Sequence, residues 1–400
     1  MTATSPPIQA PSTPAPEPTK VLVVTHYYSE HGGGIELVAQ HLMQELTSNG
    51  DFIFTWAASN CDPASTISNV KPLPMKSCNV FEKCFKIPWP IWSLKSLWTL
   101  NKEIKKTDIL WLHDTLYFGN IFAFYIARLR GKPIAITQHI GPIPYRNPFL
   151  RWAMRTADKT FSSNMLRRAQ EVIFISDRIA EEYYQRITFT KAIKVVPNGV
   201  DLRLFHPPIP ENRRFLREQF ALKKDQPVLL FVGRFVEKKG LKTLRLLAEN
   251  LPNYRFWLVG NGPINPEFWL LPNVHIFHDK KNESLAELYQ TADLLLIPSY
   301  GEGFPLVIQE AMACGLPILC GPSTAQGCRP AIPFLHVADL WPNDPERTAK
   351  VWLEKIKSFP VPLPLRKTQK KISDFAQVSW DWPPIAHVYA DILKKMKPLK

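Results

Sequence analysis

This sequence lacks an apolar run long enough to cross a bilayer. Its longest largely apolar stretch, Leu116 to Ala127, has about 12 residues, whereas a membrane-spanning helix needs about 20. The first residues have neither the basic start nor the apolar core of a secretory signal. They are instead rich in proline, and we predict that residues 1–20 form a disordered tail. These absences favour a soluble, cytoplasmic protein.

Cysteine is scarce, and its spacing argues against two kinds of structural site. The six cysteines are scattered, with no Cys-x-x-Cys pair and no companion histidines, so neither a zinc site nor a disulfide framework is expected. The glycines of Gly32–Gly34 do not follow the Gly-x-Gly-x-x-Gly pattern either, so a dinucleotide cofactor such as NAD gains little support.

Positive charge is in excess, and most of it lies in one segment. The formal net charge is +14, and residues 71–168 supply +12 of it through 17 Lys or Arg against 5 Asp or Glu. Basic and aromatic side chains together suit an anionic membrane surface, and they also suit nucleic acid. A solvated positive face above an aromatic core is the third interpretation. We favour membrane contact and consider nucleic acid the least supported partner. The aromatic residues that interleave with the basic ones include Phe81, Phe85, Trp89, Trp92, Trp98, Tyr145, Phe149 and Trp152.

Short apolar runs alternate with helical patterns along the chain, which is typical of strand–helix–strand units and parallel sheets. A cluster of Pro, Asn and Gly between Pro197 and Pro210 separates two such series. We therefore predict an α/β fold of two doubly wound domains facing each other across a cleft. The predicted strands are Val21–Thr25, Ile53–Ala57, Ile109–Leu112, Ile134–Thr137, Val172–Ile175 and Ile193–Val196, then Val228–Val232, Arg255–Val259, Val274–Phe277, Leu294–Ile297 and Pro317–Cys320.

The segment from Ser299 to Glu310 is the most informative one for function. It follows the predicted strand Leu294–Ile297, turns through two glycines and places Pro305 in the first turn of a predicted helix. Glu302 in the loop and Glu310 in the helix flank the helix N-terminus, which suits a phosphate. A sugar nucleotide needs both kinds of group, amides for its diphosphate and carboxylates for its hydroxyls. The amides predicted to point into solvent are those of Gly303, Phe304, Leu306 and Val307.

Residues 302–317 resemble the Glu-x7-Glu signature of the retaining glycosyltransferases of family 4. Four other segments are similar to that family and come in its order: Gly32–Ile35, Val196–Asp201, Val232–Gly240 and Val259–Pro263. One glycine-rich turn proves little, whereas five matches in order are specific. The resemblance implies the GT-B fold, with an acceptor-side domain at residues 21–205 and a donor-nucleotide-binding domain at 206–380. It also implies that residues 381–400 form a closing helix on the first domain.

The resemblance implies how the donor is held. Arg234 and Lys239 would clamp the diphosphate, because fixed cations stabilise the charge that develops as the sugar–phosphate bond breaks. Glu302 would contact the sugar hydroxyls and Glu310 the ribose. His139 resembles the family's active-site histidine near the donor sugar, and Asp114 is a weaker candidate on the acceptor side. Further donor contacts are implied for Gly33, Gly34, Gly260, Gly303, Phe304, Leu306 and Val307.

The sequence contains no Asp-x-Asp, the arrangement with which metal-dependent nucleotide-sugar enzymes usually hold their cation. We therefore expect Arg234, Lys239 and helix amides to replace a metal, with no cofactor besides the nucleotide-sugar donor. Two places depart from the family pattern. His278 stands where glycine is frequent near the nucleotide base, and residues 322–330 replace a Gly-Gly-x-x-Glu-like segment. The base and the sugar therefore stay open.

These features predict a retaining, metal-independent glycosyltransferase that is peripheral on the inner face of a membrane. Its acceptor would be lipid-linked or membrane-associated, in the synthesis of a cell-surface polysaccharide or glycolipid. Front-side transfer, in which the leaving phosphate helps to deprotonate the acceptor, is favoured over double displacement through Glu302. The alternatives are a soluble acceptor, a catalytically silent membrane- or sugar-binding protein of the same fold, a nucleic-acid binder and a sugar-nucleotide epimerase.

Overall fold

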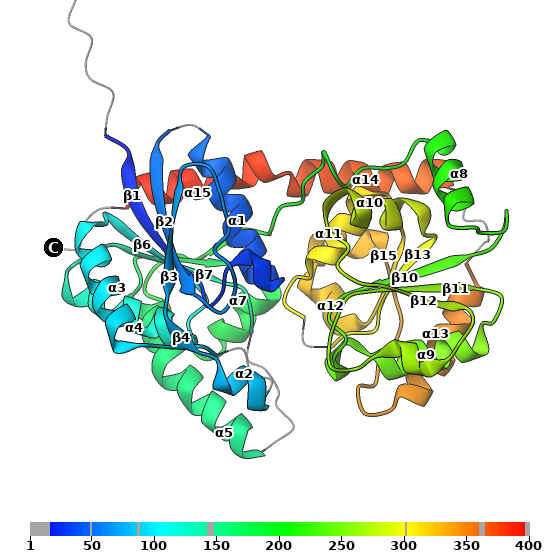
Figure 1. Cartoon of the computed structure of the whole chain (residues 1–400), viewed down its shortest axis with the longest axis horizontal. Helices are drawn as coiled ribbons and strands as arrows, with labels where there is room; N and C mark the ends of the chain where they lie inside the picture. The colour runs from blue at the N-terminus through cyan, green and yellow to red at the C-terminus, as the bar shows by residue number, and fades with distance from the viewer. Residues whose placement is uncertain are drawn as a thin grey trace, which may run out of the picture.

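The computed structural model describes residues 17–48, 50–85, 89–141, 148–300, 302–359 and 365–396. Two parallel β-sheets, each flanked by helices, form two lobes that lie side by side (Figure 1). The predicted fold class, α/β with two doubly wound domains, is thereby confirmed. Residues 1–16 of the predicted tail lie outside the described residues, and the first strand already begins at Thr19, inside the boundary predicted for that tail.

The first lobe contains a seven-stranded parallel sheet with the order β3-β2-β1-β6-β7-β8-β9. Its strands are β1 (Thr19–Val24), β2 (Phe52–Ser59), β3 (Val70–Met75), β6 (Ile109–His113), β7 (Ile134–Gln138), β8 (Glu171–Phe174) and β9 (Lys194–Val195). Its helices are α1 (Gly34–Thr47), α2 (Val80–Phe85), α3 (Leu94–Lys106), α4 (Phe118–Leu129), α5 (Pro148–Ala157), α6 (Ser163–Arg168) and α7 (Asp177–Tyr184). A small antiparallel pair, β4 (Ser77–Cys78) with β5 (Ile91–Trp92), is added between β3 and α3.

The second lobe contains a six-stranded parallel sheet with the order β12-β11-β10-β13-β14-β15. Its strands are β10 (Val228–Val232), β11 (Arg255–Val259), β12 (Val274–Phe277), β13 (Leu294–Ile297), β14 (Ile318–Cys320) and β15 (Leu335–Val337). Its helices are α8 (Pro210–Gln219), α9 (Leu241–Asn250), α10 (Asn282–Thr291), α11 (Leu306–Ala313), α12 (Pro322–Gly327), α13 (Pro345–Lys357) and α14 (Leu365–Trp380).

Both sheets reverse their strand order at one point, and these points locate the ligand sites of such folds. β1 pairs with β2 on one side and β6 on the other, and β10 pairs with β11 and β13. Ligands of open α/β sheets bind outside the carboxyl ends of the strands at this reversal. The loops after β1, β6, β10 and β13 are therefore the candidate ligand-binding loops.

The sequence missed two edge strands for a physical reason. β3 contains Pro72 and Pro74, and proline is tolerated in a sheet only where its missing N–H needs no partner, as at an edge. β15 is only three residues long and is the edge strand at one end of the second sheet, so its sequence signal is weak. In contrast, β10, β11, β12 and β13 begin and end where their apolar runs predicted.

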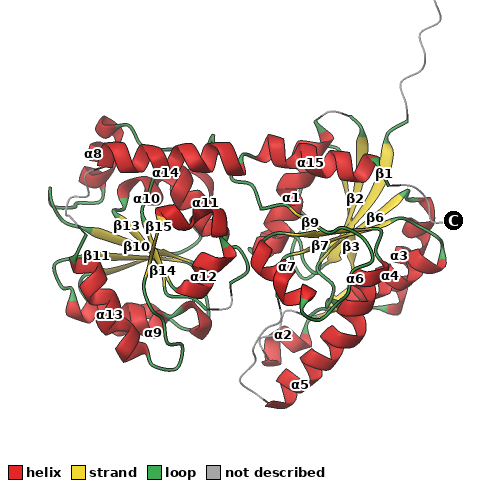
Figure 2. Cartoon of the chain, turned by 180° about the vertical axis from the view of Figure 1, so that it is seen from behind, coloured by secondary structure: helices red, strands yellow, loops and turns green. Residues whose placement is uncertain are grey.

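Two consecutive helices connect the lobes. α14 packs on α11 in the second lobe, and α15 (Trp382–Lys394) packs on α1 in the first, so that the pair runs along both lobes (Figures 1 and 2). The break falls at Asp381, before two prolines in the first turn of α15. Trp382 stacks on His41 with ring centroids 5.2 Å apart. Within the part of the chain that the structure describes, no helix has both the length and the apolar character needed to span a bilayer.

Candidate active site

The residues predicted to carry function lie in loops, or in the helices that follow them, at the carboxyl ends of strands in both lobes. In the second lobe they follow β10, β11 and β13, and in the first they follow β1, β6 and β7. The two sets meet where the lobes touch. The site therefore has a donor-side wall in the second lobe and an opposite wall in the first.

Lys239 and Glu302 form an ion pair across two loops of the second lobe. Lys239 lies in a one-turn 3₁₀ helix that ends at Gly240, which has a φ of +76°. A side chain at Gly240 would collide with the main chain of Pro298, so only glycine lets this turn pack against the end of β13. The turn then directs the Nζ of Lys239 to within 2.8 Å of the Oε1 of Glu302.

Neighbouring cations keep the carboxyl group of Glu302 ionised. The side chains of Lys239 and Glu302 are only 17% and 12% exposed, so water screens the pair weakly. Burial alone would raise the pKa of Glu302, but the ammonium groups of Lys239 and Lys238 outweigh that effect and lower the pKa below its ordinary value. Glu302 is therefore a carboxylate at neutral pH.

Glu310, the second carboxyl of the signature, has a different environment. Its Oε2 accepts a hydrogen bond of 2.7 Å from the hydroxyl of Tyr289 in α10. Burial raises the pKa of Glu310 to about 7, and the hydrogen bond from Tyr289 offsets only part of that rise. The two carboxyls therefore do not share one partner, and they differ in charge at neutral pH.

The loops after β10 and β11 touch each other beside the ion pair of Lys239 and Glu302. Gly260 has a φ of +146°, and a side chain there would collide with the carbonyl of Gly233. Arg234 is exposed on the loop after β10. His278 lies against the same loops, with its Nδ1 3.0 Å from the carbonyl oxygen of Gly260. The residue that departs from the family pattern thus borders the predicted donor site.

In the first lobe, Asp114 fixes the loop that carries His139. Asp114 directly follows β6 and has a φ of +66°, and its Oδ1 accepts hydrogen bonds from the amides of His139 (2.8 Å) and Ile140 (3.3 Å). Asn120 donates to the carbonyl of Asp114 at 2.8 Å. Burial raises the pKa of Asp114 to about 7, against the two amide hydrogen bonds that lower it. The side chain of Asp114 therefore fixes the main chain of the loop that carries His139.

His139 presents its carbonyl, not its ring, to the second lobe. Its Nε2 is 2.9 Å from the Nδ1 of His113, and the two rings stack. Burial lowers the pKa of His139 to about 3, so the imidazole is neutral at physiological pH. A Cβ at Gly303 would lie only 2.6 Å from the carbonyl oxygen of His139. The main chain of this loop therefore touches the loop of Glu302.

The side chains at the start of α11 pack toward the first lobe, and the solvent-facing direction predicted for its amides stays a prediction. Phe304 and Pro305 are buried, and the Leu306 side chain comes within 3.9 Å of a Cβ placed at Gly34, next to Gly33 at the start of α1. Val307 is partly buried against the apolar core. Pro305 is the residue before the helix, one position earlier than predicted. This contact between the lobes could not be predicted from a local sequence pattern.

Several residues near the site were missed by sequence reasoning. Arg178 donates to the main-chain carbonyl of Glu302 from the other lobe. His26 and Glu36 form a buried pair 3.0 Å apart between the end of β1 and the start of α1, and burial raises the pKa of Glu36 to about 8. Arg178 and His26 both come shortly after a predicted strand, which is the signal that would have indicated them.

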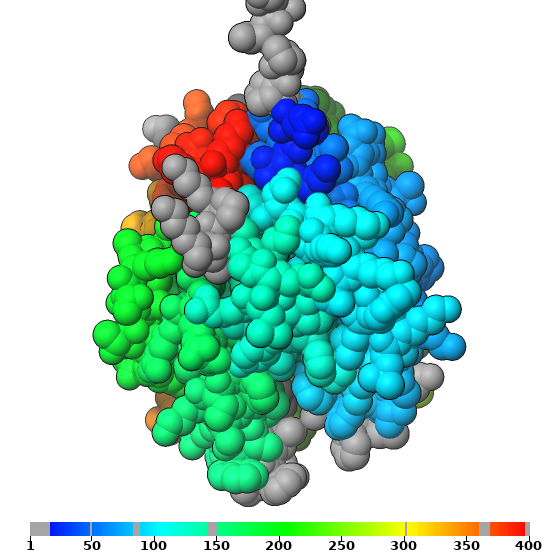
Figure 3. Space-filling view, turned by 90° about the vertical axis from the view of Figure 1, so that its left-hand side faces the viewer, coloured from blue at the N-terminus to red at the C-terminus, as the bar shows by residue number. Residues whose placement is uncertain are grey.

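The basic and aromatic segment is split between core and surface. Trp92 is buried, whereas Trp98 and Trp152 are 58% and 63% exposed; the side chains of Phe85, Tyr145 and Phe149 lie outside the described ones. We call the exposed residues of α3 and α4 the α3–α4 surface, on the end of the first lobe that Figure 3 shows in cyan. Its members are Leu94, Lys95, Trp98, Lys102, Lys105, Lys106, Phe122, Arg128, Leu129 and Arg130.

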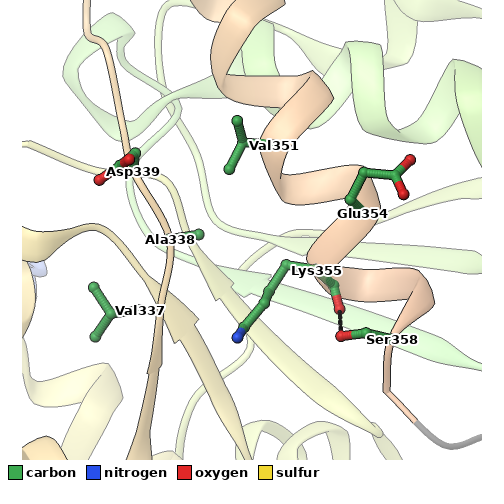
Figure 4. Close-up of a pocket in the computed structure, with 7 residues that line it drawn as sticks. All are labelled: Val337, Ala338, Asp339, Val351, Glu354, Lys355 and Ser358. Carbon is green, nitrogen blue, oxygen red and sulfur yellow. Dashed lines mark hydrogen bonds between the residues drawn. The ribbon is translucent and has the colours of Figure 1, made fainter.

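A pocket of about 450 Å³ lies elsewhere, between β15 and α13 (Figure 4). It is lined by Val337, Ala338, Asp339, Val351, Glu354, Lys355 and Ser358. These residues include no member of the predicted site, so the pocket is separate from the place where the lobes meet.

Two family profiles match the chain. The family described as "Glycosyltransferase Family 4" matches residues 32–204, and "Glycosyl transferases group 1" matches residues 212–329. The two matches fall on the first and the second lobe, with the break at the predicted linker. Together they account for most of the chain.

Curated relatives and a solved structure agree with these matches. The chain is 35% identical over 142 residues to a D-inositol 3-phosphate glycosyltransferase of Xylanimonas cellulosilytica, covering 32% of this chain and 34% of that protein. It is 27% identical over 279 residues to the N,N'-diacetylbacillosaminyl-diphospho-undecaprenol alpha-1,3-N-acetylgalactosaminyltransferase of Campylobacter jejuni, covering 67% and 72%. The chain spans about a third of the length of the first relatives that it matches.

The fold is similar to that of HepE from Anabaena in complex with UDP and glucose. The TM-score is 0.71 at 17% identity, and the alignment covers 94% of this chain and all of HepE. At this identity the likeness shows the fold alone.

Proposed function

We propose that this chain, which belongs to glycosyltransferase family 4 and has the GT-B fold, moves a sugar from a nucleotide-sugar donor to a lipid-linked or membrane-associated acceptor. The reaction would retain the anomeric configuration and use protein cations instead of a metal. The observation that carries the proposal is the pair of Lys239 and Glu302, which lies at the strand reversal of the second sheet and faces the His139 loop of the first. A silent copy of the fold has no need of this arrangement.

The ion pair prepares two groups for the donor. With no ligand, the Nζ of Lys239 neutralises the Glu302 carboxylate. A donor diphosphate beside Lys239 and Arg234 would draw the ammonium away from Glu302, whose oxygens then become free to accept hydrogen bonds from sugar hydroxyls. The cations would stabilise the diphosphate more strongly as the bond to the sugar breaks, because charge accumulates on the leaving oxygen.

The transfer step needs no protein base in this arrangement. The bond between the anomeric carbon and the diphosphate oxygen breaks, and the acceptor oxygen bonds to that carbon from the same face. The acceptor proton passes to the oxygen of the leaving phosphate. His139 would serve through its main chain and its neutral ring, since its pKa of about 3 leaves its imidazole a weak base and its Nε2 is occupied by His113.

The nucleotide would lie across the second lobe. Glu310 would accept hydrogen bonds from the ribose, and ionisation of its carboxyl, which has a pKa of about 7, would strengthen them. Gly260 and His278 border the region for the base. HepE contains UDP in its solved complex, and we therefore propose uridine diphosphate sugars as the first donors to test.

The acceptor side would lie against a membrane. The α3–α4 surface combines exposed rings with cations, and the Nζ of Lys102 is 3.3 Å from the ring centroid of Trp98. Leu94 and Leu129 are 85% and 88% exposed beside it. Such a surface would place rings at the headgroup level and cations near acidic lipid. The Campylobacter jejuni relative acts on an undecaprenol-linked sugar, which supports a lipid-linked acceptor and a peripheral location on the cytoplasmic face.

A panel of UDP-, GDP-, ADP- and dTDP-sugars, measured by thermal shift, is the first test. A ligand at a hundred times its Kd stabilises the folded state by about 2.7 kcal/mol. The expected result is that one nucleotide stabilises the wild type and not Arg234→Ala/Lys239→Ala, and that free nucleotide appears once an acceptor is added. If no nucleotide sugar stabilises the protein, the silent GT-B-like binder is favoured instead.

The membrane contact is tested separately. Wild type and Trp98→Glu/Lys102→Glu are sedimented with vesicles of phosphatidylglycerol and with vesicles of phosphatidylcholine. We expect the wild type to sediment with the anionic vesicles alone and the variant with neither. Equal sedimentation of the two proteins would refute this surface as the membrane contact.

A further inference from the structure

Helix α7 of the first lobe lies directly against the donor-side loop of the second. α7 contacts α12, and both helices lie at the junction of the lobes (Figures 1 and 2). α7 begins after Ser176, whose hydroxyl accepts a hydrogen bond of 3.4 Å from the amide of Ile179. This cap fixes the first turn of α7. The residues of that first turn therefore face the second lobe in a fixed orientation.

Arg178, in this first turn, binds the main chain of Glu302. Its Nη2 donates to the carbonyl oxygen of Glu302, and its Nη1 donates to the Oε1 of Glu182 at 3.0 Å. The Arg178 side chain is 18% exposed. A guanidinium has its donors in a fixed fork, so the contact orients the peptide that it binds.

A second arginine reaches across the junction in the opposite direction. Arg329 of the second lobe binds both carboxylate oxygens of Glu181 in α7, with its Nη2 2.5 Å from Oε2. Arg329 belongs to residues 322–330, the segment that departs from the family pattern in sequence. The segment in which the sequence departs from the family pattern therefore supplies a contact between the two lobes.

The main chain around these arginines is packed so closely that it leaves no room for a side chain at two glycines. A Cβ at Gly303 would lie 2.6 Å from the His139 carbonyl oxygen and 2.8 Å from the Cδ1 of Ile179. A Cβ at Gly327, the last residue of α12, would collide with the carbonyl of Gly303. α7, the Glu302 loop and α12 thus interlock through two glycines.

We propose that Arg178 is a positioning residue for sugar transfer, and that it forms with the Arg329–Glu181 pair a latch that sets the Glu302 loop when the lobes close. The inference rests on the proposed function, because Glu302 is assigned there to the sugar. Arg178 acts on the reaction through the peptide of Glu302. It also helps to keep that carboxyl ionised, since the positive charge of Arg178 lowers the pKa of Glu302 along with the two lysines.

The Arg329–Glu181 pair and the contact of Arg178 with Glu302 differ in burial and therefore in strength. The Arg329 and Glu181 side chains are 38% and 50% exposed, and such a pair opens easily because water replaces its hydrogen bonds. The Arg178 side chain is more buried than either member of that pair. The outer pair would thus release the lobes between turnovers, as product release demands.

The kinetic test compares Arg178→Met with Arg178→Lys and the control Arg186→Met. Arg186 follows the same helix but pairs with Asp158 inside the first lobe. With the donor and acceptor identified by the nucleotide-sugar panel, we expect Arg178→Met to lower kcat by roughly ten-fold or more, as for a lost charge-assisted hydrogen bond, with a smaller change in donor KM. Arg178→Lys should recover part of the loss. An unchanged kcat in Arg178→Met would overturn the proposal.

A second test needs no activity. The single variants Glu181→Arg and Arg329→Glu and the double variant with both changes are compared by small-angle X-ray scattering without ligand. We expect a larger radius of gyration in each single variant and the wild-type value in the double variant, where the charges are exchanged. Wild-type scattering in all three proteins would overturn the latch. Because scattering does not depend on turnover, an inactive wild type would count against the proposed function and leave this result decisive for the latch.

Discussion

Replacing Lys239 with methionine isolates the charge that holds Glu302. Methionine keeps most of the length and the apolar stem of lysine but removes the ammonium, which lies 2.8 Å from the Glu302 carboxylate. The matched control is Lys242→Met, which removes an exposed lysine from the start of α9. Both variants have the same change in net charge, so any difference between them comes from the ion pair.

The size of the effect follows from the burial of the pair. Exposed ion pairs contribute about 0 to 1 kcal/mol, whereas breaking a buried one costs about 3 to 5 kcal/mol. The Lys239 and Glu302 side chains are 17% and 12% exposed, so we expect a loss of about 2 kcal/mol. In a unit the size of one lobe this corresponds to a fall in Tm of about 4 to 8 °C. Lys242→Met should change Tm by less than about 2 °C.

The loss should also depend on pH in a definite direction. The pKa of Glu302 in the wild type lies below its ordinary value of 4.5, so the carboxylate stabilises the folded state above that pH and the contribution is lost as the pH falls through the folded pKa. Without Lys239, burial acts with less opposition and the carboxylate becomes costly. The Tm difference between wild type and variant is therefore largest at neutral pH, and it shrinks as the pH falls through the higher pKa of Glu302 in the variant toward the lower pKa in the wild type.

Differential scanning calorimetry between pH 4 and pH 8, with and without the stabilising nucleotide sugar, measures both effects. The variant should also lose most of the donor-induced shift in Tm, because the proposed diphosphate clamp would then lack one of its two cations. A Tm difference that is the same at pH 4 and pH 8, or a donor shift equal to that of Lys242→Met, would refute the electrostatic reasoning.

Three other changes test separate parts of the structure. Gly303→Ala places a Cβ 2.6 Å from the carbonyl oxygen of His139, so the rate of transfer should fall at least ten-fold in steady-state kinetics; a loss under two-fold would show that the close approach is not needed. Asp114→Asn removes a carboxyl whose pKa is raised by burial to about 7. As the pH rises from 4 to 7, the free energy of unfolding of the wild type should fall by up to about 1.4 kcal/mol per pH unit relative to this variant. Urea titrations that give parallel curves of stability against pH for the two proteins would contradict that. Arg213→Met removes the cation that lies 2.7 Å from the buried carboxylate of Asp293 and leaves that carboxylate with Arg217 at 3.3 Å. The free energy of unfolding should fall by about 2 kcal/mol in denaturant titrations, whereas a loss below about 0.5 kcal/mol would mean that Arg213 is dispensable.

The parts of the fold that the sequence predicted well are those with strong local signals. The central strands of the second sheet are buried on both faces, so each appears as a short apolar run with clear ends, and Val228–Val232 and Leu294–Ile297 were located to the residue. The edge strand Val70–Met75 could not be found, because its two prolines argue against a strand and only its position at the edge of the sheet makes them acceptable.

The sequence by itself determined the family, the two α/β lobes and the loops that carry the site, because motif spacing and buried strands are local properties. Only the tertiary structure decided how the site residues are used. It pairs Lys239 with Glu302, turns the His139 ring toward His113, and closes the start of α11 against the first lobe. It also brings Arg178, 124 residues away in the chain, to the carbonyl of Glu302. These contacts join segments from different strands and different lobes, and their geometry depends on how whole sheets and helices pack.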